Sequence, residues 1–223
     1  MLLFETRALC KYYRNGSQSE VRALDEVSLG IERGSLTVVT GPSGSGKTTL
    51  LALLGALERP TRGEVFFDAR SLSDCSDVAL ARARRRMGFV FQDFALIPNL
   101  SAEGNITYPL IPRGVPRAER RRRAGAVLAR FGMEDKRAVR ARGLSGGEQQ
   151  RVAIARALAD QPEVVLADEP TSNLDPEAGR QLLALLQAIH AEGRTILIAT
   201  HDPRLIAASE EVYHLEAGRL TAR

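Results

Sequence analysis

The chain has 223 residues, of which 44% are hydrophobic and 26% charged, and its formal net charge at pH 7 is +4. This composition suffices for a sizeable buried core, but no stretch reaches the length of a membrane-spanning helix, about 18 consecutive apolar residues. Met1–Glu5 lacks the pattern of a secretory signal, and Cys10 and Cys75 have no metal-binding or disulfide spacing, so we expect a cytosolic protein with reduced thiols.

The first predicted strand, Leu36–Thr40, leads into a glycine-rich loop that a helix-like stretch follows. The loop consists of Gly41, Pro42, Ser43, Gly44, Ser45, Gly46, Lys47 and Thr48, and Thr49 comes next. Its glycines let backbone N–H groups converge on phosphate oxygens, and Lys47 adds a positive charge. A helix beginning near Gly46 directs the positive end of its dipole toward the same anion. This P-loop pattern predicts that the chain binds a nucleoside triphosphate.

The middle of the chain predicts a strand and then an inserted helical lobe. Met87–Phe91 has the pattern of a strand, and Gln92 follows it. From Pro98 to Arg142 the chain is rich in arginine and alanine, is interrupted by prolines and has no convincing strand, so we expect a helical subdomain over about residues 98–160.

Two clusters of arginines lie in or near this region. The first is Arg82, Arg84, Arg85 and Arg86, and the second is Arg117 with Arg120, Arg121, Arg122 and Arg123. We expect a continuous basic face only from the second. Because no aromatic residues interleave with either cluster, a solvated helix face is the simpler interpretation, and a contact with lipid headgroups or a partner is the alternative.

A second apolar run ends in two carboxylates. Val164–Ala167 has the pattern of a buried strand, and Asp168 and Glu169 follow it directly. This is the Walker B arrangement, in which Asp168 holds Mg²⁺ through its water shell and Glu169 orients or deprotonates the attacking water. Acidic residues at a strand end are common, so the weight of this pattern comes from its pairing with the P-loop.

The last part of the chain continues the alternation of strands and helices. Pro176–Ala191 predicts an amphipathic helix with Asp175 as its N-cap. Thr195–Ala199 predicts a further strand, and Val212–Leu215 begins a closing hairpin. Together these elements predict an α/β fold with a mainly parallel sheet. Without a flexible linker we expect one domain over residues 1–223.

The segment Leu144–Arg151 indicates which class of P-loop protein the chain resembles. Ser145 and the N–H groups of Gly146 and Gly147 open a predicted helix and make a second anion-binding site. The segment resembles, without mismatch at Leu-Ser-Gly-Gly, the signature motif of the ATP-binding-cassette (ABC) ATPases. The resemblance implies ATP and Mg²⁺ as cofactors and a P-loop NTPase core, with helices on both faces of the sheet, N-terminal antiparallel strands and an inserted helical lobe. It also implies a head-to-tail dimer in which Ser145, Gly146, Gly147 and Glu148 of one subunit cover the ATP of the other.

The same resemblance implies roles for further residues. Thr48 and Asp168 position the metal. Gln92 matches the Q-loop glutamine, which in the family contacts Mg²⁺ or the water and communicates with the membrane partner. Asp175, in a segment that resembles the D-loop, contacts the opposite subunit. His201 matches the switch histidine that senses the γ-phosphate.

An aromatic residue on which adenine stacks is also implied, and two neighbouring tyrosines compete for this role. Tyr13 is favoured over Tyr12 by its place before Asn15-Gly16, and such stacking typically contributes about 1–3 kcal/mol. His190 and His214 have no comparable context, and we expect structural roles for them.

Within the family, the chain looks most like the ATPase subunits of lipoprotein-releasing and macrolide-export systems, the LolD and MacB type. The local similarity lies in Leu9–Lys11, Gly41–Lys47, Gly88–Gln92, Leu96–Pro98 and Leu166–Thr171. One departure is Glu103-Gly104-Asn105, where members often carry Leu-Glu-Asn. Gly104 destabilises a helix start by up to about 1 kcal/mol and lacks the carboxylate that family members carry there. We therefore do not assign this position the permease-docking role that the resemblance would imply.

The resemblance therefore predicts a cytosolic ATPase that associates with the cytoplasmic face of the inner membrane through a permease, most simply as a homodimer. The alternative is a soluble ABC ATPase that acts on nucleic acid or ribosomes. The positive charge favours it, but Gly46–Leu144 has no room for a long coiled coil or zinc module, and we expect no specific nucleic-acid partner. A P-loop kinase or GTPase would leave the Leu144–Arg151 segment unexplained.

Overall fold

The computed structural model describes residues 1–15 and 19–221. Gly16, which entered the comparison of the two tyrosines, lies outside them. The strands are β1 (Leu2–Asn15), β2 (Ser19–Val27), β3 (Gly30–Glu32), β4 (Leu36–Thr40), β5 (Arg62–Phe67), β6 (Arg70–Ser71), β7 (Met87–Val90), β8 (Val164–Asp168), β9 (Thr195–Ala199), β10 (Glu211–Glu216) and β11 (Arg219–Thr221). The α-helices are α1 (Lys47–Leu54), α2 (Asp77–Arg84), α3 (Ala102–Thr107), α4 (Arg117–Arg130), α5 (Gly146–Leu158), α6 (Pro176–Ala191) and α7 (Pro203–Ala207). Two 3₁₀-helices are η1 (Tyr108–Leu110) and η2 (Ala141–Gly143).

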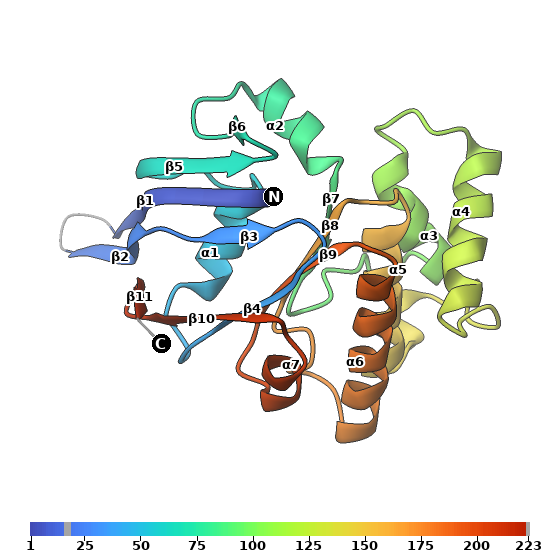
Figure 1. Ribbon diagram of the computed structural model, residues 1–223. Coiled ribbons are helices and arrows are strands. Elements are labelled where there is room, and N and C mark those ends of the chain that lie inside the picture. The colour runs from blue at the N-terminus through green and yellow to red at the C-terminus, as the bar shows by residue number, and fades with distance from the viewer. Residues whose placement is uncertain (16–18, 222–223) are drawn as a thin grey trace.

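The described strands form an antiparallel sheet and a mainly parallel sheet (Figure 1). The antiparallel sheet has the order β2-β1-β5-β6, and β3 also pairs with β1. The second sheet has the order β11-β10-β4-β9-β8-β7, in which β11 alone runs antiparallel to its neighbour. This confirms the predicted α/β class, the N-terminal antiparallel strands and the closing hairpin. The carboxyl ends of β4, β8 and β9 meet at one edge of the sheet, which is where ligands bind in open α/β sheets.

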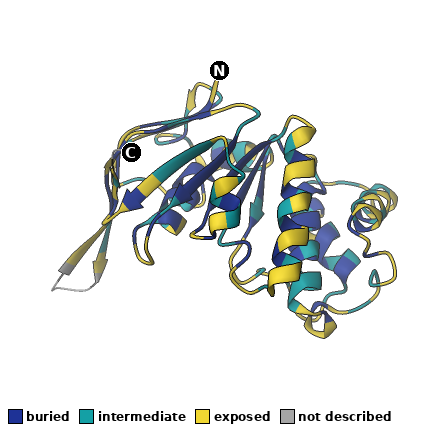
Figure 2. Ribbon diagram, turned by 60° about the horizontal axis from the view of Figure 1, so that its bottom comes forward, coloured by how far each residue is buried: buried dark blue, intermediate teal, exposed yellow. Residues whose placement is uncertain are grey.

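Successive residues of the parallel strands face two different cores. Val38 and Val165 belong to a core that α5, α6 and the helical lobe cover, whereas Val39 and Leu166 belong to a core that α1 and the antiparallel sheet cover. This follows from the two-residue period of a strand. Figure 2 shows the central strands as buried and the outward sides of the helices as exposed. Burial on both faces explains why these strands are continuous apolar runs.

The predicted inserted lobe contains α3, η1, α4 and η2, on the side of the parallel sheet away from the antiparallel one (Figure 1). Ser101 and Arg140 form an isolated bridge that ties its two ends together. Helix α5 contacts α3 and α4 but also β7, so it joins the lobe to the core. A subdomain boundary near residue 160 stays a prediction. No helix within residues 1–15 and 19–221 is both long and apolar enough to cross a bilayer.

Two strand ends differ by one residue from the prediction. Strand β7 ends at Val90, not Phe91, because it lies at the edge of the sheet and its ladder with β8 stops at Val90. Strand β8 includes Asp168, because β9 continues beside it and pairs Asp168 with Ala199. The bounds predicted for α6, β4 and β9 are confirmed.

Candidate nucleotide-binding site

The predicted P-loop connects β4 to α1 at the carboxyl edge of the parallel sheet. Gly41 has a φ of 149°, and a Cβ there would lie 1.9 Å from the carbonyl oxygen of Leu215. Gly46, the N-cap of α1, has a φ of 106°, and a Cβ there would lie 2.3 Å from the carbonyl oxygen of Ala23. Both positions therefore require glycine, because other backbone segments approach the loop closely. The loop leads into the N-terminus of α1, whose first N–H groups have no partner within the helix.

Lys47 is the first residue of α1, and its side chain is only 7% exposed. Its Nζ donates hydrogen bonds to the carbonyl oxygens of Gly41 at 2.8 Å and Pro42 at 2.9 Å. The ammonium group is thereby held over the loop, next to the positive end of the helix dipole. Within the described chain, the buried Oγ of Ser45 has no hydrogen-bond partner. An anion in the loop would meet a fixed charge, a helix N-terminus and this hydroxyl.

Asp168 ends β8 and lies close to Thr48 of α1. Burial raises the pKa of the Asp168 carboxyl; Thr48 and Lys47 oppose this rise, and the neighbouring charge of Glu169 adds to it. Its Oδ1 is buried and accepts no hydrogen bond from any described residue. Such an oxygen is costly unless a cation or proton meets it. Carboxylate and hydroxyl oxygens beside a phosphate site fit Mg²⁺, which commonly takes one or two protein ligands together with phosphate and water.

Glu169 is held by three contacts beyond the strand. Its Oε2 accepts a hydrogen bond from Oγ1 of Thr200 at 3.1 Å, and its Oε1 lies 3.0 Å from Nδ1 of His201 and 3.9 Å from Nζ of Lys47. The Glu169 backbone has a φ of 41°, and a left-handed conformation at a residue other than glycine costs about 1–3 kcal/mol and is typical of functional positions. A carboxylate fixed beside the loop in this way can orient a water molecule or accept its proton.

The segment after Glu169 reaches across to the end of β7. Oγ of Ser172 donates to the carbonyl oxygen of Glu169 at 2.9 Å, and Nδ2 of Asn173 donates to the carbonyl oxygen of Gln92 at 3.0 Å. Further along, Oδ1 of Asp175 accepts the first free N–H groups of α6. The capping role of Asp175 is therefore confirmed. Its predicted contact with an opposite subunit stays a prediction.

A cavity of about 340 Å³ brings most of the predicted residues together, a volume in the lower range of small-molecule sites, roughly 300–1,000 Å³. Its lining comprises Val21, Arg22, Ala23, Ser43, Gly44, Ser45, Gly46, Lys47, Thr48, Thr49, Gln92, Glu169, Ser172 and His201. We call it the P-loop cavity. The predicted site residues outside this lining are Tyr13, Gly41, Pro42, Ser145, Gly146, Gly147, Glu148, Asp168 and Asp175.

The two tyrosines considered for adenine stacking both adjoin this cavity. The hydroxyl of Tyr13 donates to Oε2 of Glu58 at 2.7 Å, and the side chain of Thr49, a lining residue, also lies within hydrogen-bonding reach. Burial raises the pKa of Tyr13. The ring of Tyr12 lies 5.3 Å from the guanidinium carbon of Arg22, another lining residue. The assignment of adenine to Tyr13 stays a prediction.

The predicted second anion site lies at the N-terminus of α5. Oγ of Ser145 accepts the N–H of Glu148 at 3.3 Å, and Oε2 of Glu148 accepts the N–H of Ser145 at 2.8 Å. This reciprocal capping box confirms that Ser145 opens a helix. Within the described residues, the segment Ser145–Glu148 contributes nothing to the lining of the P-loop cavity. One chain therefore presents the two predicted anion sites on separate surfaces.

Thr200 and Arg22 are among the residues of the site that were not found from the sequence. Thr200 is fully buried between β9 and His201, and it holds Glu169 while its Oγ1 accepts the N–H of Asp202 at 3.1 Å. The sequence did contain a signal for Thr200, because a residue with a hydroxyl group stands between the predicted strand and His201. Arg22 lines the cavity because β2 pairs with β1. No local pattern in the sequence indicates that placement.

Some arginines of the two clusters pair with acidic side chains, namely Arg86, Arg121, Arg122 and Arg123. Arg86 contacts both Asp68 and Glu163. On α4, Arg122 and Arg123 pair with Glu119, whose pKa these contacts lower to about 2, and Arg123 also contacts Asp160. The expected continuous basic face of α4 is therefore interrupted, because Glu119 lies one turn from both arginines.

Comparisons with known proteins agree with this geometry. Residues 24–172 match the family model described as ABC transporter. An uncharacterized ABC transporter ATP-binding protein of Thermotoga maritima is 44% identical over 202 residues, covering 90% of this chain and 86% of that protein. The macrolide export ATP-binding/permease protein MacB of Hyphomonas neptunium is 43% identical over 219 residues. This match covers 98% of this chain but only 34% of the length of MacB. Among solved structures, the dimeric post-hydrolysis state of the ATP-binding cassette MJ0796 bound to ADP and Pi superimposes with a TM-score of 0.91 at 39% identity, covering 98% of this chain and 97% of the other.

Proposed function

The chain belongs to the ABC transporter family, and from this premise we propose that it is the ATP-hydrolysing, nucleotide-binding part of a transporter of the macrolide-export or lipoprotein-release type. The observation that carries the proposal is the convergence of the P-loop, Lys47 and Glu169 on one cavity beside the unpartnered carboxylate oxygen of Asp168. The similar cassette bound to ADP and Pi supports hydrolysis of a nucleotide in this cavity.

Several residues in and beside the cavity have roles in phosphoryl transfer to water. The loop amides and Lys47 would bind the phosphates, and Thr48 and Asp168 would hold Mg²⁺, which would neutralise charge on the phosphates. Glu169 would orient the attacking water and take its proton. His201 contacts the Glu169 carboxylate, and its predicted contact with the terminal phosphate is part of this proposal. In this class of reaction, positioning and fixed charges supply most of the rate enhancement.

We propose that a second copy of the chain completes each site. Ser145 and Glu148 lie outside the P-loop cavity, at an exposed helix N-terminus that suits an anion. A head-to-tail arrangement gives both copies a complete site, since each contributes one half to the other. Because the chain carries both halves intact, two identical copies form the simplest assembly. The dimeric structure of the similar cassette supports this arrangement.

The transporter proposal also requires a surface for a permease. A groove of about 450 Å³ between β7 and the helical lobe is lined in part by Phe91, Ile97 and Tyr108, which are exposed apolar side chains. Contiguous exposed apolar residues of this kind mark partner surfaces. Phe91 precedes Gln92, so an occupant of the groove lies next to a residue of the P-loop cavity. We propose that a permease segment occupies this groove and holds the chain at the cytoplasmic face of the inner membrane.

The departure from the family pattern at Gly104 lies outside this groove. The N–H of Gly104 is capped by Oγ of Ser101 at 3.0 Å. The adjacent carboxylate of Glu103 is paired with Arg137 at 2.7 Å and with Arg121 at 3.3 Å, and both Glu103 and Gly104 line a different hollow of the lobe. The departure from the family pattern at Gly104 therefore leaves the lining of the proposed groove unchanged.

The test is to capture the chain, carrying Glu169→Gln, from detergent-solubilised native membranes in the presence of ATP, and to identify its companions by mass spectrometry. A polytopic permease is the expected companion, and its domains outside the membrane would distinguish drug export or lipoprotein release from import. The same capture with Lys47→Ala, which removes the phosphate-binding charge, is the control for nucleotide dependence. Recovery of ribosomes or nucleic-acid-binding proteins without a membrane protein would overturn the proposal in favour of a soluble ABC ATPase.

A further inference from the structure

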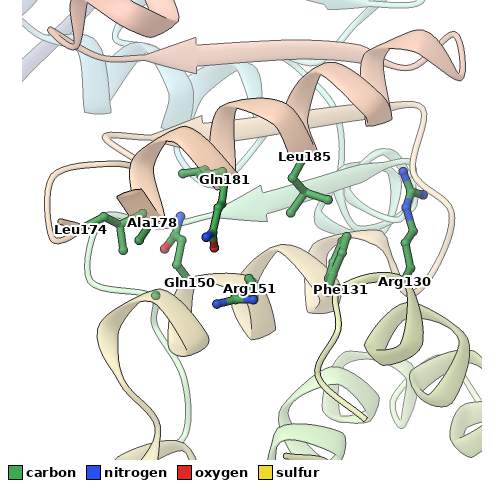
Figure 3. A pocket seen from close by; sticks show the side chains of 10 residues that line it. Arg130, Phe131, Gln150, Arg151, Leu174, Ala178, Gln181 and Leu185 are labelled. Atoms are coloured by element: carbon green, nitrogen blue, oxygen red, sulfur yellow. The ribbon is translucent and has the colours of Figure 1, made fainter. Parts of the chain in front are cut away.

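A second cavity, of about 160 Å³, lies between α5 and α6 (Figure 3). It shares no lining residue with the P-loop cavity, and the proposed function uses none of its polar side chains. Its walls are largely apolar. They include Phe131, Leu174, Leu182 and Leu185, with Gln150 and Arg151 as polar members. We call it the α5–α6 cavity.

Gln150 is the unusual member of this lining. It is 2% exposed, and within the described chain neither Nε2 nor Oε1 of its amide has a hydrogen-bond partner. Figure 3 shows its side chain rising from α5 toward α6, beside Ala178. Its neighbour Gln149, in contrast, donates to the carbonyl oxygen of Leu144 at 3.0 Å. Because buried polar groups are normally paired, the Gln150 amide indicates a missing donor and a missing acceptor in this cavity.

The cavity also carries an uncompensated positive charge. Arg151 is half-buried and makes no ion pair or hydrogen bond with any described residue. Two other polar lining side chains already have partners: Arg130 pairs with Glu192 at 2.7 Å, and Gln181 donates to Glu177 at 3.0 Å. The groups left for a ligand are therefore one guanidinium and one amide, set in an apolar wall.

We propose that the α5–α6 cavity binds a small organic acid with an apolar body and a hydroxyl group next to its carboxylate. The carboxylate pairs with Arg151 and accepts a hydrogen bond from Nε2 of Gln150, while the ligand hydroxyl donates to Oε1 of Gln150. The apolar body packs against Leu182 and Leu185. An apolar cavity of about 150 Å³ accommodates a benzene-sized molecule. The four-carbon branched body of 2-hydroxyisocaproate is smaller than benzene and fits this space, while its carboxylate extends toward the half-buried Arg151.

The experiment titrates the full chain with 2-hydroxyisocaproate by calorimetry and ligand-observed NMR, with and without saturating Mg²⁺ and ATP. We expect saturable binding at one site per chain that ATP does not displace. We expect 4-methylpentanol, which lacks the carboxylate, to bind at least about tenfold more weakly. The readout is binding alone, so it does not depend on hydrolysis or on the proposed permease.

Three variants locate the site. Gln150→Leu replaces an unpartnered amide by an apolar side chain of similar size, so it should fold normally and bind the probe at least about tenfold more weakly. Arg151→Gln should weaken binding by a similar factor, and Gln149→Leu, the same change one residue away and outside the lining, should not. The proposal is overturned if the probe shows no saturable binding, as expected when water alone satisfies the amide. It is also overturned if ATP displaces the probe, or if Gln149→Leu and Gln150→Leu bind it equally.

Discussion

Replacing Asp168 by asparagine is expected to stabilise the chain while it removes Mg²⁺-dependent ATP binding. In the chain without nucleotide, the Asp168 carboxylate is buried, Oδ1 accepts no hydrogen bond from the described residues, and burial raises the pKa. The uncharged amide of the Asp168→Asn variant avoids the cost of a buried charge. The same change removes the anionic ligand that we assign to the metal.

The expected change in the free energy of unfolding follows from the polar groups that Asp168→Asn removes and adds. An unsatisfied buried polar group costs about 1–3 kcal/mol, and more when it is charged, but the new amide N–H groups also need acceptors and cancel part of the gain. We therefore expect the free energy of unfolding to rise by about 1 kcal/mol, which raises the Tm by about 2–4 °C for a chain of this size. Mg²⁺ and ATP at about 100 times Kd should add about 2.7 kcal/mol to the wild type and much less to the variant.

The pH dependence gives an independent check of this reasoning. The pKa of Asp168 in the folded chain lies above its ordinary value of 3.8, so the protonated carboxyl carries no penalty below that value. The penalty grows as the pH rises from 3.8 toward the raised pKa and is constant above it. The difference in stability between the wild type and the Asp168→Asn variant should therefore shrink when the pH falls through this window.

The assay is urea unfolding followed by circular dichroism, with and without Mg²⁺ and ATP. Glu134→Gln is the matched control, because Glu134 is exposed and its side chain has no described partner, and we expect its effect to stay within about 0.5 kcal/mol. The reasoning is refuted if Asp168→Asn lowers the stability of the nucleotide-free chain, or if Mg²⁺ and ATP stabilise the variant as much as the wild type.

Three further predictions concern the same edge of the sheet. Glu169→Gln should lower the ATP turnover rate by about 10²–10⁴-fold, measured as phosphate release at saturating ATP, because the amide cannot accept the proton of the water; turnover at the wild-type rate would exclude Glu169 as the base. Gly41→Ala should cost more than about 3 kcal/mol of stability, because its Cβ would overlap the carbonyl of Leu215, whereas Gly44→Ala, with nothing within 4 Å of its Cβ, should cost about 1–2 kcal/mol for its left-handed backbone alone. The pKa of Asp202 is lowered from 3.8 to about 2, chiefly by its hydrogen bond with Arg204. The ionised carboxylate therefore contributes to stability fully above pH 3.8, and this contribution is lost as the pH falls toward 2. Asp202→Asn should be less stable than the wild type at pH 5, and the difference between their free energies of unfolding in urea should shrink as the pH falls.

The parts of the site that the sequence predicted are those built from neighbouring residues. The P-loop follows its strand directly, Asp168 and Glu169 end another strand, and Asp175 precedes the helix that it caps. In each case a few consecutive residues determine both the element and the position of the side chain at its end. Parallel pairing then brings these ends together, because β4, β9 and β8 are adjacent in one sheet.

The parts that the sequence did not predict depend on contacts between distant segments. Arg22 and its neighbours Val21 and Ala23 line the P-loop cavity because β2 pairs with β1, a pairing between separate segments that no local pattern predicts. The last residues of β7 and β8 also differ from those predicted. Strand β7 is one residue shorter because it lies at the sheet edge, and β8 is one residue longer because it lies between two strands. Gln150 gave no signal at all, since whether a buried amide has a partner depends on how α5 packs against α6.

The capping box at the start of α5 has a consequence for the proposed dimer. Hydrogen bonding from the N–H of Ser145 lowers the pKa of Glu148, so its carboxylate is ionised at neutral pH and lies over the helix N-terminus. That is where the signature segment must meet the phosphates of the other copy. A second anion approaching this position is repelled by the carboxylate, although the N–H groups attract it.

Lys136 offsets this repulsion. Its Nζ lies 3.2 Å from Oε1 of Glu148, so the charge of the capping carboxylate is largely balanced before any nucleotide arrives. The attraction that remains comes from the hydroxyl of Ser145 and from the backbone N–H groups at the start of α5, which are weak and short in range compared with the Lys47 ammonium in the P-loop. ATP is therefore expected to bind first to the P-loop of one copy, and the signature segment of the other to close over it afterwards.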